Sequence, residues 1–249
     1  MPARPRRRKP YELFYWPGIP GRGEYVRLAL EAAGAPYVDV VRARENGMDE
    51  MIALLEGEGT KRPAFAPPFL RDGRTIIGQT SAILFWLGPR LSLAPRSEAG
   101  ALWTHQLQLT IADLVNEAHD VHHPVGMGLY YEDQKRESAR RAEEFRTARI
   151  PKFLDYFEAV LAANGATKAK PHLVGKSLTY ADLSLFHTLE GLACAFPKTM
   201  GRLARGRPLL ASLRAAVKKR PRIKAYLASE RRQPFNENGI FRHYKELDR

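Results

Sequence analysis

The chain has 249 residues, 44% of them hydrophobic and 27% charged, and 40 basic against 27 acidic side chains give a formal net charge of +13. This composition excludes a mostly disordered chain, a collagen and a disulfide-stapled mini-protein. We expect no transmembrane helix because no stretch approaches about 18 uninterrupted apolar residues. Cys194 is the only cysteine, so no disulfide can form within one chain.

The basic charge is concentrated in two segments. Residues 1–10 carry five basic side chains and no acidic one, and residues 200–232 carry eleven against one. We predict that residues 1–10 form a disordered basic tail. No apolar secretory segment follows them, so the expected compartment is the cytoplasm. A nucleic-acid partner is not expected, because zinc-finger spacing and interleaved stacking aromatics are absent.

Residues 11–88 alternate strand and helix patterns. The alternating segment 11–15 predicts a strand, and the stripe of apolar residues in 24–33 predicts a helix that ends at Gly34. The pair Asp72-Gly73 is typical of a hairpin turn. The remaining expected elements are strands at 37–41, 69–70 and 75–77 and helices at 49–55 and 80–87. This order predicts a mixed sheet with helices packed against it.

The rest of the chain shows helical patterns only. After a linker at 89–98, residues 99–232 predict an all-helical domain, and residues 233–249 a C-terminal extension in coil. Thr179 and Asp182 predict a capping box for a helix that should be buried, because it is apolar nearly all round. The expected helices are 102–121, 140–163, 181–195, 209–219 and 222–229.

Three short segments carry candidate chemistry. Tyr15 ends the first strand before a turn rich in glycine and proline, which places its hydroxyl at a cleft above the sheet. Pro67 and Pro68 stand just before a strand. Gln79 and Thr80 open a helix, and helix N-termini bind carboxylates through their free N–H groups. A tyrosine packed only by its ring is the alternative for Tyr15.

Taken in order, these segments resemble the cytosolic glutathione transferases over roughly residues 11–232. The turn motif, Tyr15-Trp16-Pro17 followed by Gly21-Arg22-Gly23, is most similar to the mu, pi and sigma classes. The resemblance implies a thioredoxin-like α/β N-terminal domain, an all-α C-terminal domain and a cis peptide at Pro68. The other matching segments are Gln79-Thr80, Thr179–Asp182 and residues 220–227.

The resemblance also implies roles for individual residues. The Tyr15 hydroxyl would stabilise the thiolate of glutathione, the co-substrate, and a homodimer is expected because Asp113 would meet the glutamyl ammonium from the second subunit. The glycyl carboxylate has three candidate cations, Arg42, Lys61 and Arg62. The implied glutathione-binding residues are Arg22, Pro67, Pro68, Gln79, Thr80 and Asp113. The implied second-substrate residues are Trp16, Ile19, His119, His123, Met127 and Tyr131.

The resemblance implies conjugation of glutathione to hydrophobic electrophiles, in a detoxifying role. Isomerisation or peroxide reduction would use the same thiolate, and a non-catalytic glutathione-binding protein is a further alternative. His119 and His123 share a helix face, as metal ligands do. We expect no metal, because no second helix offers a matching set of ligands.

Overall fold

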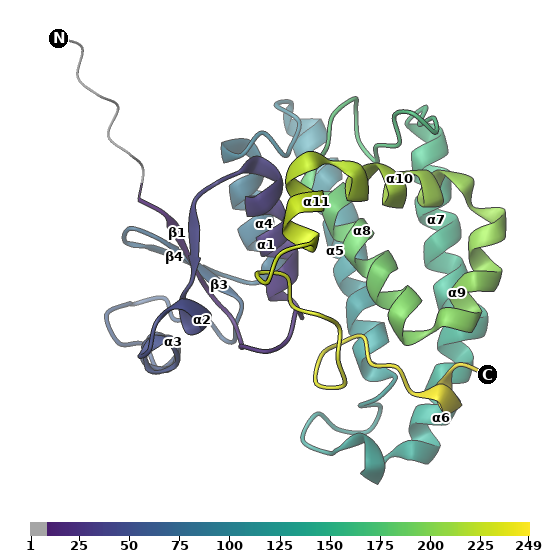
Figure 1. The fold of residues 1–249 in the computed structure, drawn as a ribbon, viewed down its shortest axis with the longest axis horizontal. Helices are drawn as coiled ribbons and strands as arrows, with labels where there is room; N and C mark the ends of the chain where they lie inside the picture. Colours follow the sequence, from purple (N-terminus) through teal and green to yellow (C-terminus); the bar gives the residue numbers. More distant parts are fainter. Residues whose placement is uncertain (1–8) are drawn as a thin grey trace.

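The computed structural model describes residues 9–249, so residues 1–8, most of the predicted basic tail, lie outside the described residues. The N-terminal domain follows the predicted alternation of strands and helices, except that the predicted strand 37–41 ends at residue 39 and residues 40–43 form an additional short helix (Figure 1). Its elements are β1 (Tyr11–Phe14), α1 (Gly23–Ala33), β2 (Tyr37–Asp39), α2 (Val40–Ala43), α3 (Gly47–Leu55), β3 (Phe69–Asp72), β4 (Thr75–Gly78) and α4 (Thr80–Arg90).

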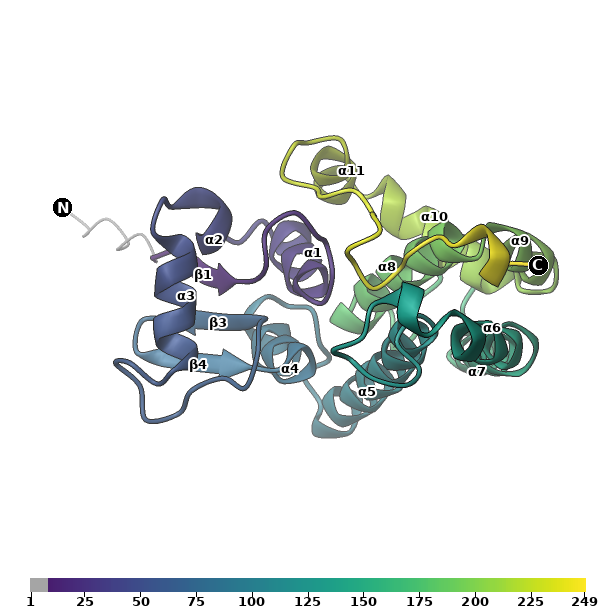
Figure 2. The ribbon, with the colours of Figure 1, turned by 90° about the horizontal axis from the view of Figure 1, so that it is seen from below.

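The sheet has the strand order β2-β1-β3-β4. β1 pairs in parallel with β2 and antiparallel with β3, and β4 pairs antiparallel with β3. Successive side chains of a strand point to opposite faces. Leu13 therefore packs with α1 and α4, whereas Phe14 packs with Met51 of α3. Figure 2 shows α1 and α4 between the sheet and the helical domain, and α3 on the outer face.

The C-terminal domain is helical, as the sequence predicts. Its central helix is α8, which is buried on almost every side and packs against α1, α5 and α10 (Figure 1). Its elements are α5 (Glu98–Asp120), η1 (Tyr131–Asp133), α6 (Lys135–Glu144), η2 (Phe145–Arg149), α7 (Ile150–Ala163), α8 (Tyr180–Ala195), α9 (Pro197–Leu203), η3 (Ala204–Gly206), α10 (Pro208–Lys219), α11 (Pro221–Leu227) and η4 (Lys245–Leu247).

The capping box at the start of α8 is confirmed. The backbone N–H of Thr179 donates to Asp182 Oδ2 at 2.7 Å, and the N–H of Asp182 donates to Thr179 Oγ1 at 3.4 Å. The second carboxylate oxygen of Asp182 accepts from the N–H of Leu173 at 2.8 Å. Both Thr179 and Asp182 are buried, so these bonds replace water at this helix start.

The predicted helix 140–163 is divided in the structure. α6 and α7 are separated by η2, a π-helical turn that ends just before Pro151. Proline has no N–H and its ring clashes with the carbonyl four residues earlier, so regular α-helical bonding cannot continue through it. The short helix α9, which the sequence reading missed, also begins at a proline, Pro197.

The connection between the domains is shorter than the predicted 89–98. α4 continues through Pro89 to Arg90, and α5 begins at Glu98, where the hydroxyl of Ser97 accepts from the N–H of Gly100. The connection therefore spans residues 91–97. Among the residues that the structure describes, no helix is long and apolar enough to cross a membrane.

The C-terminal extension, residues 233–249, is coil except for η4, and it packs firmly on the helical domain. Ile240, Phe241 and Leu247 are buried in the core. Asp248 caps the start of α9, because its carboxylate accepts the N–H groups of Lys198 at 2.7 Å and Thr199 at 3.1 Å. The extension is therefore part of the folded domain.

Candidate active site

Tyr15 directly follows β1 and is only 4% exposed. The turn between β1 and α1 folds back over its ring. A Cβ atom on Gly21 would lie 2.1 Å from the Tyr15 hydroxyl oxygen, and one on Gly23 would lie 2.6 Å from the ring. These two glycines therefore permit the close approach of the turn to the tyrosine.

The Tyr15 hydroxyl is held as a neutral hydrogen-bond donor. Its oxygen accepts from the backbone N–H of Arg22 at 2.7 Å. Burial raises the pKa of the Tyr15 phenol above its usual value, and the Arg22 N–H offsets only part of this rise. The phenol keeps its proton at neutral pH, and the incoming N–H leaves that proton available to a ligand.

Arg22 connects the two domains at this point. Its guanidinium Nη2 donates to Asn116 Oδ1 of α5 at 2.8 Å, and its carbonyl accepts from Thr80 Oγ1 at 3.4 Å. The residue immediately precedes α1. The turn of residues 15–22 (the tyrosine turn), the start of α4 and the C-terminal part of α5 therefore meet around one arginine.

The start of α4 opens into a cavity. Its N-cap residue, Gln79, makes no side-chain cap bond and has a φ of +64°. Residues with a Cβ rarely adopt a positive φ, and such strain often accompanies a binding function. The cavity has a volume of about 100 Å³ and is lined by Arg22, Tyr25, Gln79, Thr80, Ser81, Gln108, Ile111, Ala112, Val115 and Asn116.

Gln108 brings an unpaired polar atom to this cavity. The residue is buried in α5, and its Oε1 has no hydrogen-bond partner among the described residues. The sequence reading missed it, although the α5 residues that line the cavity recur every three or four positions. That spacing was the available signal. Asp113, the acidic residue expected near the ligand, is exposed and does not line the cavity.

The expected cis peptide is confirmed at Pro67–Pro68. It precedes β3, in which Phe69 pairs with Phe14, the neighbour of Tyr15. The prolines therefore lie at the same end of the sheet as the tyrosine. Pro67 has no N–H and can offer only its carbonyl to a ligand.

The predicted second-substrate residues are only partly brought together. The rings of His119 and His123 stack at 4.9 Å. Trp16 is 39% exposed on the tyrosine turn, Ile19 is half-buried in the same turn, and Met127 is 70% exposed. Tyr131 is engaged elsewhere, because it stacks on Tyr244 and its hydroxyl donates to Glu246 at 2.8 Å.

The C-terminal extension adds residues to this region that sequence reasoning did not identify. Asn236 Nδ2 donates to the carbonyl of Gly18 at 2.7 Å, which connects the extension to the tyrosine turn. The imidazole of His122 bonds the carbonyl of Ile240 at 2.9 Å. No motif in residues 233–249 signals these contacts. The extension therefore borders the tyrosine turn on one side and the histidines on the other.

The three candidate cations for the glycyl carboxylate differ in their environment. Arg42 donates to the backbone carbonyls of Arg231 at 2.8 Å and Glu230 at 3.1 Å, so its guanidinium is engaged with the other domain. Lys61 and Arg62 are exposed in the segment between α3 and β3. Those two side chains are the freer of the three to meet a carboxylate.

Known proteins resemble this chain both in sequence and in fold. Residues 119–230 match the family model described as "Glutathione S-transferase, C-terminal domain". The chain is 24% identical to a glutathione S-transferase of Plasmodium falciparum (isolate 3D7) over 226 residues, 88% of this chain and 96% of that protein. It is 26% identical to glutathione S-transferase P of Bos taurus over 234 residues, 92% of this chain and 98% of that one.

Solved structures share the arrangement of both domains. A pi-class glutathione S-transferase of Onchocerca volvulus superposes with a TM-score of 0.69 at 24% identity, covering 93% of this chain and 99% of that one. The sequence matches and the shared fold together extend over nearly the whole chain. Together they support a cytosolic glutathione transferase.

Proposed function

We propose that the protein conjugates the thiolate of glutathione to hydrophobic electrophiles, with the Tyr15 hydroxyl stabilising the thiolate. The observation that carries this proposal is the buried, neutral phenol of Tyr15, whose oxygen accepts the Arg22 N–H and whose proton is free to donate. The phenol acts as a donor to sulfur, because an ionised tyrosine could not supply that proton.

The energetics of one hydrogen bond suffice for this role. A free thiol has a pKa of about 8.5, so only a small fraction is thiolate at neutral pH. Lowering that pKa by about two units needs roughly 2.7 kcal/mol. A hydrogen bond to a charged group supplies about 1.5–3 kcal/mol.

The glutamyl end of glutathione fits the cavity at the start of α4. Its carboxylate would meet the first turn of α4 at Gln79 and Thr80, and Arg22 also lines this cavity. Its ammonium would donate to the unpaired Oε1 of Gln108. The cysteinyl unit would then extend along Pro67 and Pro68 toward Tyr15, and the glycyl carboxylate toward Lys61 or Arg62.

The electrophile would bind between the tyrosine turn, the end of α5 and the C-terminal extension. Trp16 and Ile19 offer apolar surface on the turn, and His119 and His123 offer polar atoms at the end of the helix. Asn236 closes one side of this region through its bond to Gly18. Met127 is exposed enough to contact a large substrate, whereas Tyr131 would need to leave its contact with Glu246.

A homodimer is part of the proposal. Leu102, Leu109 and Asp113 lie on one face of α5, and both leucines are exposed. Phe85 of α4 is also exposed, and Phe65, before β3, is 96% exposed. Burying this apolar surface against a second copy would carry Asp113 to the partner's site. Sedimentation of the intact protein measures this association directly.

Isomerisation and peroxide reduction are alternatives that use the same thiolate. We propose that the protein acts in the cytoplasm and removes reactive electrophiles there. Conjugation is favoured over a purely binding role because the Tyr15 oxygen accepts the Arg22 N–H, which leaves the phenolic proton to donate to the sulfur.

The test is the pKa of the thiol of bound glutathione, followed by the ultraviolet absorbance of the thiolate as a function of pH. In the parent protein we expect this pKa about two units below 8.5, and in Tyr15→Phe we expect it close to 8.5. Conjugation at pH 7 should fall by about 25-fold in Tyr15→Phe, in step with the thiolate fraction, with little change in glutathione affinity.

Tyr25→Phe is the matched control, because it also removes a buried hydroxyl near the cavity, one that bonds Thr188 Oγ1 at 3.0 Å. It should leave the thiol pKa of the parent unchanged. Tight glutathione binding with an unshifted thiol in the parent would instead identify a non-catalytic binding protein. A lowered pKa that persists in Tyr15→Phe would assign thiolate stabilisation to another group.

A further inference from the structure

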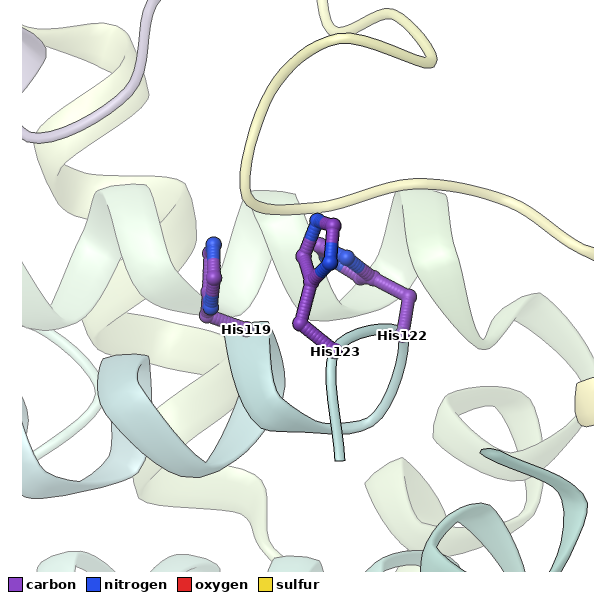
Figure 3. Close-up of side chains that lie close together, drawn as sticks. All are labelled: His119, His122 and His123. Atoms are coloured by element: carbon purple, nitrogen blue, oxygen red, sulfur yellow. The ribbon is translucent and has the colours of Figure 1, made fainter. Parts of the chain in front are cut away.

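Three histidines form a compact cluster where α5 ends. His119 lies in the last turn of α5, and His122 and His123 lie in the turn that follows (Figure 3). The three ring centroids are 4.8–5.0 Å apart. One ring nitrogen from each histidine lies within 4.8 Å of the other two. The sequence analysis considered only His119 and His123, which are four residues apart, although His122 is three residues after His119 and also shares this helix face.

Backbone carbonyls fix which nitrogen of two of these rings carries a proton. His122 Nε2 lies 2.9 Å from the carbonyl of Ile240, and His123 Nδ1 lies 3.0 Å from the carbonyl of Leu129. A carbonyl only accepts, so both of these nitrogens are protonated and the other nitrogen of each ring has a free lone pair. The free Nδ1 of His122 is buried and has no partner among the described residues.

This is the hydrogen bonding that metal-bound histidines use. A ligating imidazole usually donates its second N–H to a carbonyl or carboxylate, which orients the ring and raises its basicity. His119 Nδ1 lies 3.7 Å from the carboxylate of Asp120, which is too long for a hydrogen bond.

We infer that His119, His122 and His123 form a binding site for a divalent transition-metal ion of the zinc class. Neutral imidazoles suit zinc, copper and nickel, and three protein ligands leave a coordination position open. Tetrahedral zinc requires nitrogens about 3.3 Å apart, so the cluster must close by about 1.5 Å from its present spacing. His119 and His123 are half-buried side chains and can make this movement.

The charges around the cluster act on a bound cation in both directions. The guanidinium groups of Arg22 and Arg242 would repel it, whereas the carboxylate of Asp120 would attract it. A bound metal would connect the end of α5 with the C-terminal extension, because His122 is bonded to Ile240. The site does not depend on the proposed glutathione chemistry.

The test is titration of the full-length, tag-free protein with Zn²⁺ in competition with a chromogenic chelator. We expect one Zn²⁺ per chain and a higher midpoint of thermal unfolding with Zn²⁺ bound. Loss of a residue that only hydrogen-bonds a metal ligand weakens metal binding by roughly 10–100-fold. His119→Gln and His123→Gln each remove a ligand, so each should weaken Zn²⁺ binding by more than that. Co²⁺ should give the strong visible absorption of a tetrahedral site in the parent and lose it in both variants.

His105→Gln is the matched control, because His105 is a partly buried histidine of the same helix whose ring packs on Phe85. Its Zn²⁺ affinity should equal that of the parent. Circular dichroism confirms that each variant is folded, and the half-buried positions 119 and 123 carry the test if variants of the buried His122 do not fold. No Zn²⁺ binding by the parent, or equal binding in the double variant His119→Gln/His123→Gln, would overturn the inference.

Discussion

Two helix starts in this molecule solve the same physical problem in opposite ways. The first turn of any α-helix has backbone N–H groups without partners inside the helix. At the start of α8, Thr179 and Asp182 satisfy these groups from within the chain. At the start of α4, Gln79 provides no side-chain cap, and the turn faces a cavity that it shares with Arg22.

The difference separates a structural role from a binding role. The α8 start is buried and already contains its carboxylate, so it has no capacity for an external anion. The α4 start has the same preference for negative charge but lacks the carboxylate. The sequence shows this contrast directly, because an acid follows three residues after Thr179 and none follows at that distance after Gln79.

The largest expected effect follows from breaking the α8 start. Asp182→Ala leaves the buried N–H groups of Leu173 and Thr179 without acceptors. Each buried unsatisfied donor costs about 1–3 kcal/mol, so unfolding in urea should show a loss of roughly 3 kcal/mol or more. Asp182→Asn keeps one acceptor oxygen and should lose less. A loss below about 1 kcal/mol in Asp182→Ala would show that water replaces the carboxylate.

The features that the sequence predicted well are those set by neighbouring residues. The capping box joins residues three apart, and the Asp72-Gly73 hairpin is equally local, whereas the cis peptide at Pro68 was expected from the family resemblance. The alternation of strands and helices followed from hydrophobic periodicity. The π-turn before Pro151 was missed because the apolar pattern runs through it, although the proline itself was a local signal.

The features that the sequence did not predict depend on contacts between distant segments. Tyr131 bonds Glu246, 115 residues away, so its spacing after α5 was no guide to its surroundings. Gln108 reaches the cavity only because α5 packs beside Arg22. The coil pattern of residues 233–249 predicted little structure, yet Phe241 packs in the core and against His187 of α8. Tertiary packing decides each of these cases.

A smaller effect concerns His187, in the middle of α8. Burial holds the pKa of this imidazole well below its usual value, and the cations Arg232 and Arg27 lower it further. The unfolded chain takes up a proton below about pH 6.5 whereas the folded chain does not, so acid favours unfolding. His187 should contribute up to about 1.4 kcal/mol of lost stability per pH unit below that value.

The check is the free energy of unfolding between pH 7 and pH 4 for the parent and His187→Phe. The phenyl ring keeps the aromatic contacts with Tyr25 and Phe235 and cannot titrate. The free energy of unfolding of His187→Phe should therefore decrease less steeply than that of the parent as the pH falls. Equal slopes for the two proteins would mean that His187 does not cause the acid sensitivity.

The smallest effect sharpens the comparison at the α4 start. Gln79 has a φ of +64°, which strains a residue with a Cβ by about 1 kcal/mol or more. Gln79→Gly should therefore raise the free energy of unfolding by about 1 kcal/mol, and it should weaken glutathione binding by about tenfold through loss of the side chain.

Ser92→Gly is the matched control, because Ser92 also has a positive φ, +57°, in the connection between the domains. It should give a similar gain in stability with unchanged glutathione affinity. If both variants gain stability and only Gln79→Gly loses glutathione, the strain at α4 belongs to the binding site; if neither gains stability, the turn conformation is not strained.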